Sequence, residues 1–121
     1  MTPSDAPQHL LPLSPLDLHV LMVLAGKDLY GYAIMKAVEE ESAGALAPEI
    51  GSLYRVLARL QGTGLVREAD APGTVPETHR GRPRKYYGIT PLGLRVLRAE
   101  TERLSRVVDR ARTLLPDGGR P

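Results

Sequence analysis

A run rich in glycine and proline between positions 72 and 83 constrains the fold of this chain more than any other feature. The residues concerned are Pro72, Gly73, Pro76, Gly81 and Pro83. Such a composition cannot sustain a helix or a strand. Residues 65–68 and 84–89, on either side, are typical of strands, and the second segment carries Tyr and Ile. We therefore predict a two-stranded hairpin with an exposed loop.

Three helices are predicted before this hairpin. Ser14 suits the cap of the first helix, Pro15 its first position, and Gly26 ends it. The second helix is expected over residues 29–43, and the third over residues 52–63. The third has an apolar stripe at helical spacing, formed by Leu53, Val56, Leu57 and Leu60.

A longer helix follows the hairpin. Thr90 and Pro91 repeat the pairing of a capping residue with proline, and the helix is expected to run to residue 115. The predicted fold is mainly α with a small β-hairpin, in the order of a winged helix-turn-helix. Residues 1–12 are expected to form a flexible tail, residues 13–89 the winged module, residues 90–115 a dimerisation helix and residues 116–121 a frayed tail.

Composition excludes several classes of function. The 121 residues include no Cys, which rules out disulfides, thiolate zinc sites and iron–sulfur clusters. The longest apolar run is the six residues 20–25, whereas a membrane span needs about 20. His9, His19 and His79 lack metal-ligand spacing, and no serine has a recognisable nucleophile setting. We expect no metal, no cofactor, no enzymatic activity, no membrane partner and a cytoplasmic location.

Charge is distributed unevenly along the chain. Residues 1–48 hold two basic and six acidic side chains, net −4, whereas residues 49–98 hold nine and four, net +5. A basic middle in a nearly neutral chain indicates one localised anionic partner, although a merely solvated charged surface is the alternative.

Two basic groups coincide with the third helix and the hairpin. Ser52, Arg55 and Arg59 share the face of the third helix opposite its apolar stripe, and Tyr54 lies at the border. Arginine can bind guanine through two hydrogen bonds or clamp phosphate. The plainer interpretation is an ordinary amphipathic helix with solvated arginines.

The hairpin loop ends in four cations within six residues, namely Arg80, Arg82, Arg84 and Lys85. Gly81 permits close approach of the backbone, and Pro83 keeps it extended. An extended segment bearing arginines suits a narrow minor groove, and this one resembles the core of an AT-hook. A solvated loop is again the alternative.

The motifs together resemble the PadR family of bacterial transcriptional regulators over about residues 13–97. The resemblance is carried by Gly31-Tyr32, by Gly51-Ser52-Leu53-Tyr54 continuing to Leu57-Ala58-Arg59-Leu60, by Gly64-Leu65-Val66, and by Arg82-Pro83-Arg84-Lys85-Tyr86-Tyr87 with Ile89-Thr90 and Gly93. Arg55 departs from the pattern, since proline commonly follows the motif tyrosine, and so does Gln61, where an acidic residue is usual.

The resemblance implies a homodimeric winged-helix protein, usually a repressor. Tyr32, Ser52 and Tyr54 would contact DNA around the third helix, and Arg82, Arg84 and Lys85 would belong to the wing. Some members bind planar aromatic effectors through Trp, but this chain has no Trp and no Phe. The identity of any small-molecule effector therefore stays open.

The last helix predicts dimerisation independently of the family. A seam at alternating steps of three and four residues is formed by Leu94, Leu97, Thr101, Leu104, Val108, Ala111 and Leu115. The alternative is that this stripe packs only within its own chain. The sequence thus predicts a dimeric regulator of double-stranded DNA. A winged-helix module that binds an acidic protein is the rival interpretation.

Overall fold

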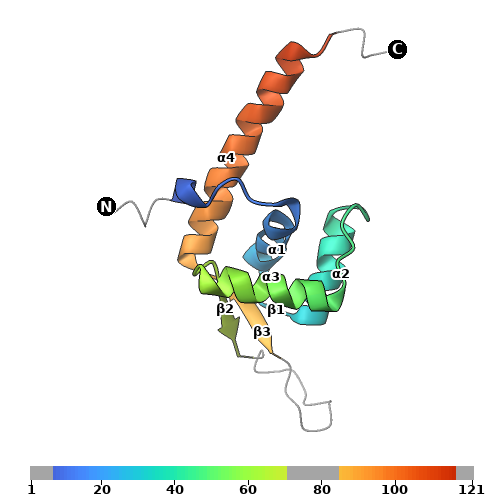
Figure 1. The fold of residues 1–121 in the computed structure, drawn as a ribbon, viewed down its shortest axis with the longest axis vertical. Helices are drawn as coiled ribbons and strands as arrows, with labels where there is room; N and C mark the ends of the chain where they lie inside the picture. Colours follow the sequence, from blue (N-terminus) through green and yellow to red (C-terminus); the bar gives the residue numbers. More distant parts are fainter. Residues whose placement is uncertain (1–6, 71–84, 117–121) are drawn as a thin grey trace.

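The computed structural model describes residues 7–70 and 85–116 of the chain. They form a helical domain with a small sheet and one long helix that extends from it (Figure 1). The elements in chain order are η2 (Pro7–Leu10), α1 (Pro15–Gly26), β1 (Leu29–Tyr30), α2 (Gly31–Glu41), α3 (Ile50–Gly62), β2 (Val66–Ala69), β3 (Tyr86–Ile89) and α4 (Pro91–Leu114). The predicted fold class, a winged helix-turn-helix followed by a long helix, is confirmed.

Capping side chains begin α1 and α4 where the sequence predicts. The Ser14 hydroxyl accepts a 3.1 Å hydrogen bond from the Asp17 amide, and the Thr90 hydroxyl accepts one of 2.9 Å from the Gly93 amide. Both helices have proline in the first turn, where its missing N–H costs no helical hydrogen bond. The third helix starts at Ile50, two residues before the predicted start.

The sheet has three strands rather than the two expected, in the order β1-β3-β2 with both pairings antiparallel. Leu29 and Tyr30 pair with Tyr87 and Tyr86, so they form an edge strand instead of opening the second helix. Two residues are too few to show the alternation that identifies a strand in sequence. In the other pairing, Val66 faces Ile89.

The core lies where α1, α2 and α3 meet the sheet and the first turns of α4. Leucines of the α3 stripe are fully enclosed: Leu53, Leu57 and Leu60 are at most 1% exposed. Val20, Leu21 and Leu24 of α1 complete this interior together with Ile34 and Val38 of α2. The acidic run at residues 39–41 faces solvent at the end of α2.

Residues 7–13 are packed on the domain and correct the prediction of a flexible tail over residues 1–12. Residues 7–10 form a 3-10 turn beside α4, and Leu10, Leu11 and Leu13 pack on the core. The Leu13 amide donates a 2.9 Å hydrogen bond to the Glu100 carboxylate. Residues 1–6 lie outside the described part.

Glu100 is a carboxylate on α4 that is only 1% exposed. Arg103, one turn further along, donates hydrogen bonds of 2.6 and 2.9 Å to its two oxygens. The bonds from Arg103, and the weaker one from the Leu13 amide, lower the pKa of Glu100 against the opposing effect of burial. The ionised carboxylate therefore fastens the N-terminal segment to α4.

In residues 7–70 and 85–116, no helix is both long and apolar enough to cross a membrane.

Glu100→Gln should lower the free energy of unfolding at pH 7 by about 1.5–3 kcal/mol, the range for hydrogen bonds to charged groups. A carboxyl whose folded pKa is lowered stabilises the fold above its unfolded pKa of about 4.3, and the benefit is lost as the pH falls through the folded pKa. Urea denaturation at pH 7 and pH 3 measures the difference. Glu102→Gln, at an exposed position of the same helix, is the matched control. A loss of equal size at both pH values would contradict this account.

Candidate nucleic-acid interface

The face of α3 opposite the leucine stripe is open to solvent. Gly51, Arg55 and Ala58 are exposed along it, because burial of Leu53 and Leu57 fixes the rotation of the helix. In Figure 1, α3 crosses the front of the domain with its long side uncovered. A helix held in this way can enter the major groove of DNA, provided that its outward side chains suit bases and phosphates.

Tyr54 of α3 reaches the start of α2, beside the glycine that precedes Tyr32. The ring of Tyr54 lies against Gly31, so closely that a Cβ built at Gly31 would stand 2.6 Å from its Oη. A larger side chain at this position would displace the Tyr54 ring. Tyr32, next in the chain, is 52% exposed and Tyr54 is 46% exposed. The Lys36 ammonium lies 5.9 Å from the centroid of the Tyr32 ring and adds positive charge beside it.

Ser52 and Arg55 interact on the outer side of α3. The Arg55 guanidinium donates a 3.1 Å hydrogen bond to the Ser52 hydroxyl. Among residues 7–70 and 85–116, Arg55 forms no salt bridge. Its positive charge is therefore available to an external anion.

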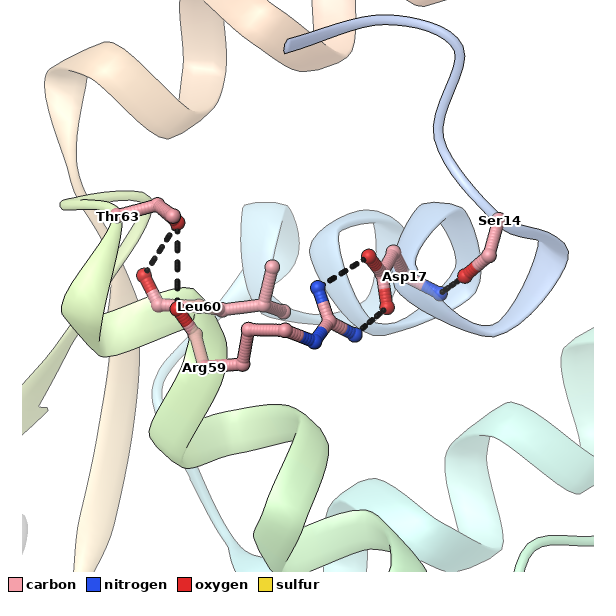
Figure 2. Close-up of polar contacts among 5 residues, drawn as sticks. All are labelled: Ser14, Asp17, Arg59, Leu60 and Thr63. Carbon is pink, nitrogen blue, oxygen red and sulfur yellow. Dashed lines mark hydrogen bonds and ion pairs between the residues drawn. The ribbon is translucent and has the colours of Figure 1, made fainter.

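Arg59, the other arginine predicted for this face, reaches back to α1. Its two terminal nitrogens donate hydrogen bonds of 2.9 and 2.7 Å to the two carboxylate oxygens of Asp17 (Figure 2). The Asp17 hydrogen bond raises the pKa of the Arg59 guanidinium against the smaller effect of burial. Sequence reasoning missed Asp17 as a partner, because 42 residues separate it from Arg59. Contact of Arg59 with DNA stays a prediction.

The predicted wing is described only in part. Lys85 is exposed and its ammonium lies 3.4 Å from the carboxylate of Glu68 on β2. Arg67 on the same strand lies 3.4 Å from Asp28. Arg80, Arg82 and Arg84 lie outside the described residues. Strands β2 and β3 lie on the side of the domain opposite the C-terminal end of α4 (Figure 1).

The C-terminal half of α4 extends beyond the rest of the domain (Figure 1) and bears an apolar stripe. Of the predicted seam, Leu94, Val108 and Leu115 are 42%, 45% and 67% exposed, Thr101 and Ala111 are exposed, and Leu104 is half-buried. Leu97 packs on the core of its own chain. Val107 and Leu114, which the seam pattern omitted, are 49% and 65% exposed. Val107 follows Leu104 by three residues and Leu114 follows Ala111 by three, so both lie beside the seam on the same face of the helix. The apolar stripe is therefore wider than a strict heptad seam.

A metal site does not form among the described residues, where His, Asp and Glu nowhere gather in a group of three.

Comparison with known proteins identifies the family of this chain. Residues 20–99 match the transcriptional regulator PadR-like family. An uncharacterized 37.1 kDa protein in transposon TN4556 of Streptomyces fradiae is 38% identical over 99 residues, which is 81% of this chain but 26% of that protein. The chain thus spans about a quarter of the relative's length.

Solved structures agree with the family assignment. A PadR family regulator from Eggerthella lenta is 31% identical with a TM-score of 0.62, over 81% of each chain. Bacillus subtilis PadR in complex with operator DNA has the same fold, with 22% identity and a TM-score of 0.60 over 73% of this chain and 47% of that one. The chain belongs to the PadR-like family of transcriptional regulators.

Proposed function

We propose that this protein is a sequence-specific DNA-binding repressor that acts as a homodimer on a pseudo-palindromic site and has no enzymatic activity. The observation that carries the proposal is the open face of α3, which bears Tyr54 and Arg55, the latter with no carboxylate partner in the described part of the chain. Family membership supports it further. A DNA regulator of this kind would work in the cytoplasm.

The proposed contacts fall into two groups. On α3 and the start of α2, Tyr32, Ser52, Tyr54 and Arg55 would meet bases and phosphates in the major groove. From the wing, Arg80, Arg82, Arg84 and Lys85 would hold flanking phosphate or minor groove. The weak 3.4 Å pair with Glu68 leaves Lys85 more than half exposed, so it could exchange that partner for phosphate at little cost.

Dimerisation is proposed through the apolar stripe of α4. An isolated chain would leave Val107, Val108, Leu114 and Leu115 in water. Packing of two such helices would bury these side chains and place two α3 helices about 34–36 Å apart, one turn of DNA. A small-molecule effector would act by binding one dimer geometry more tightly than the other.

Selection of bound sequences from a random duplex pool at roughly physiological salt tests the function directly. We expect enrichment of a site with two-fold symmetry. Failure of the folded protein to enrich any motif would favour the rival function, in which the exposed arginines meet an acidic protein. A partner pull-down with the same protein would then follow.

Arg55→Ala should reduce discrimination between the selected site and a variant of its contacted base pair by about 1–3 kcal/mol, the range for a two-bonded arginine–guanine contact. Titrations of both duplexes with wild type and variant measure this difference. Arg98→Ala removes the same charge from an exposed position of α4 and is the matched control. Equal weakening on both duplexes would show that Arg55 clamps phosphate and reads no base.

Leu104→Glu should convert the dimer to a monomer, because it places a charge within the proposed seam. Light scattering on the purified variant gives the mass. Ser105→Glu adds the same charge at the neighbouring exposed position and should leave the dimer intact. A dimeric Leu104→Glu protein would show that the seam lies elsewhere.

A further inference from the structure

The contact between Asp17 and Arg59 joins the candidate recognition helix to α1. The carboxylate and the guanidinium face each other with two parallel hydrogen bonds, the geometry in which arginine binds a carboxylate or a phosphate most strongly (Figure 2). The Asp17 side chain is 9% exposed, whereas that of Arg59 is 55% exposed. The carboxylate is thus fixed in the protein, and the cation lies at the surface beside it.

The backbone of each residue of the ion pair is also held by a hydrogen bond with a nearby side chain. Asp17 is in the first turn of α1, where the positive end of the helix dipole favours a carboxylate, and its amide is bound by the Ser14 hydroxyl. At the end of α3, the Thr63 hydroxyl lies 3.3 and 3.2 Å from the carbonyl oxygens of Arg59 and Leu60 (Figure 2). Because both helix ends are fixed, formation of the ion pair requires little further ordering of the backbone.

The two arginines of α3 therefore differ in their ionic partners, although they are one helical turn apart. Arg55 binds the neutral hydroxyl of Ser52 and keeps its full charge. Arg59 donates to a carboxylate from both terminal nitrogens, the same groups with which an arginine binds phosphate. A phosphate that recruited Arg59 would leave Asp17 buried and unpaired, which is unfavourable.

We infer that Asp17 limits the affinity of α3 for DNA of any sequence, because it holds Arg59 in an ion pair. The inference rests on the proposed DNA-binding function. Phosphate contacts raise affinity for all sequences alike, so an arginine withheld from phosphate lowers the affinity for the selected site and for random DNA by the same factor. Asp17 thereby sets the total affinity for DNA without touching DNA and without changing which sequence is preferred.

Asp17→Asn tests the inference on a random-sequence duplex. The freed Arg59 should add one phosphate contact, which steepens the plot of log affinity against log salt concentration by about 0.9. Between 50 and 200 mM salt the variant would then lose roughly threefold more affinity than wild type. The affinity for the selected site should rise by the same factor, so that the ratio of the two affinities stays as in wild type. Glu41→Gln removes one negative charge from the exposed end of α2 and is the matched control.

The double variant Asp17→Asn/Arg59→Gln provides a second, independent measurement. It keeps the net charge of wild type and replaces the ion pair with two amides that can hydrogen-bond to each other. If Arg59 makes no phosphate contact in wild type, the double variant keeps the wild-type salt slope. Thermal unfolding followed by circular dichroism verifies that each variant is folded.

Several results would overturn the inference. One is a salt slope for folded Asp17→Asn equal to that of wild type, and another is an equal steepening in Glu41→Gln. A double variant whose slope is shallower by about 0.9 would show that Arg59 already binds phosphate in wild type. Those results leave the proposed function intact, whereas a wild-type protein that binds neither the random nor any selected duplex would overturn both.

Discussion

Burial of the leucine stripe of α3 is the constraint on which the rest of this structure depends. Leu53, Leu57 and Leu60 are at most 1% exposed, and each buried leucine contributes roughly 1.5–3 kcal/mol relative to an exposed one. Rotation of α3 by a quarter turn would expose this stripe, so packing sets which side chains point outward. The outward face that bears Arg55 is therefore a consequence of the core, although none of its side chains contributes to that core.

Contacts at the junction between α3, the sheet and α4 also fix the position of the long helix. The Thr90 hydroxyl donates a 2.6 Å hydrogen bond to the Gly64 carbonyl, and the Thr90 amide donates one of 3.0 Å to the Leu65 carbonyl. A Cβ at Gly93 would clash with that same Leu65 carbonyl, so glycine is needed where α4 crosses the strand. The start of α4 is thus fixed relative to the end of α3. A change in the angle between two α4 helices would accordingly move the two α3 helices, which is the motion that the proposed effector would use.

The sequence alone predicted the features that depend on neighbouring residues, such as helix caps and the buried face of a helix. It did not predict contacts between residues that are far apart along the chain. Ser14 and Thr90 with their prolines marked two helix starts, and the stripe of α3 marked its buried face, because each signal lies within a few neighbouring residues. The strand β1 has only Leu29 and Tyr30, which is too short for any periodicity. The Leu13–Glu100 contact spans 87 residues, and the Asp17–Arg59 pair spans 42. No local pattern could indicate either, and both became visible only when the helices were placed together.

The two arginines of α3 show why a shared helix face does not imply a shared role. Helical spacing puts Arg55 and Arg59 on neighbouring turns, and both can bind anions. The two arginines differ in their hydrogen-bond partners. Arg59 binds the carboxylate of Asp17 on α1, whereas Arg55 binds only the hydroxyl of Ser52. A guanidinium paired with a buried carboxylate must lose that partner before it binds phosphate, and one bound to a hydroxyl loses little. The positive charge on the outer face of α3 that has no carboxylate partner among the described residues is therefore concentrated at Arg55.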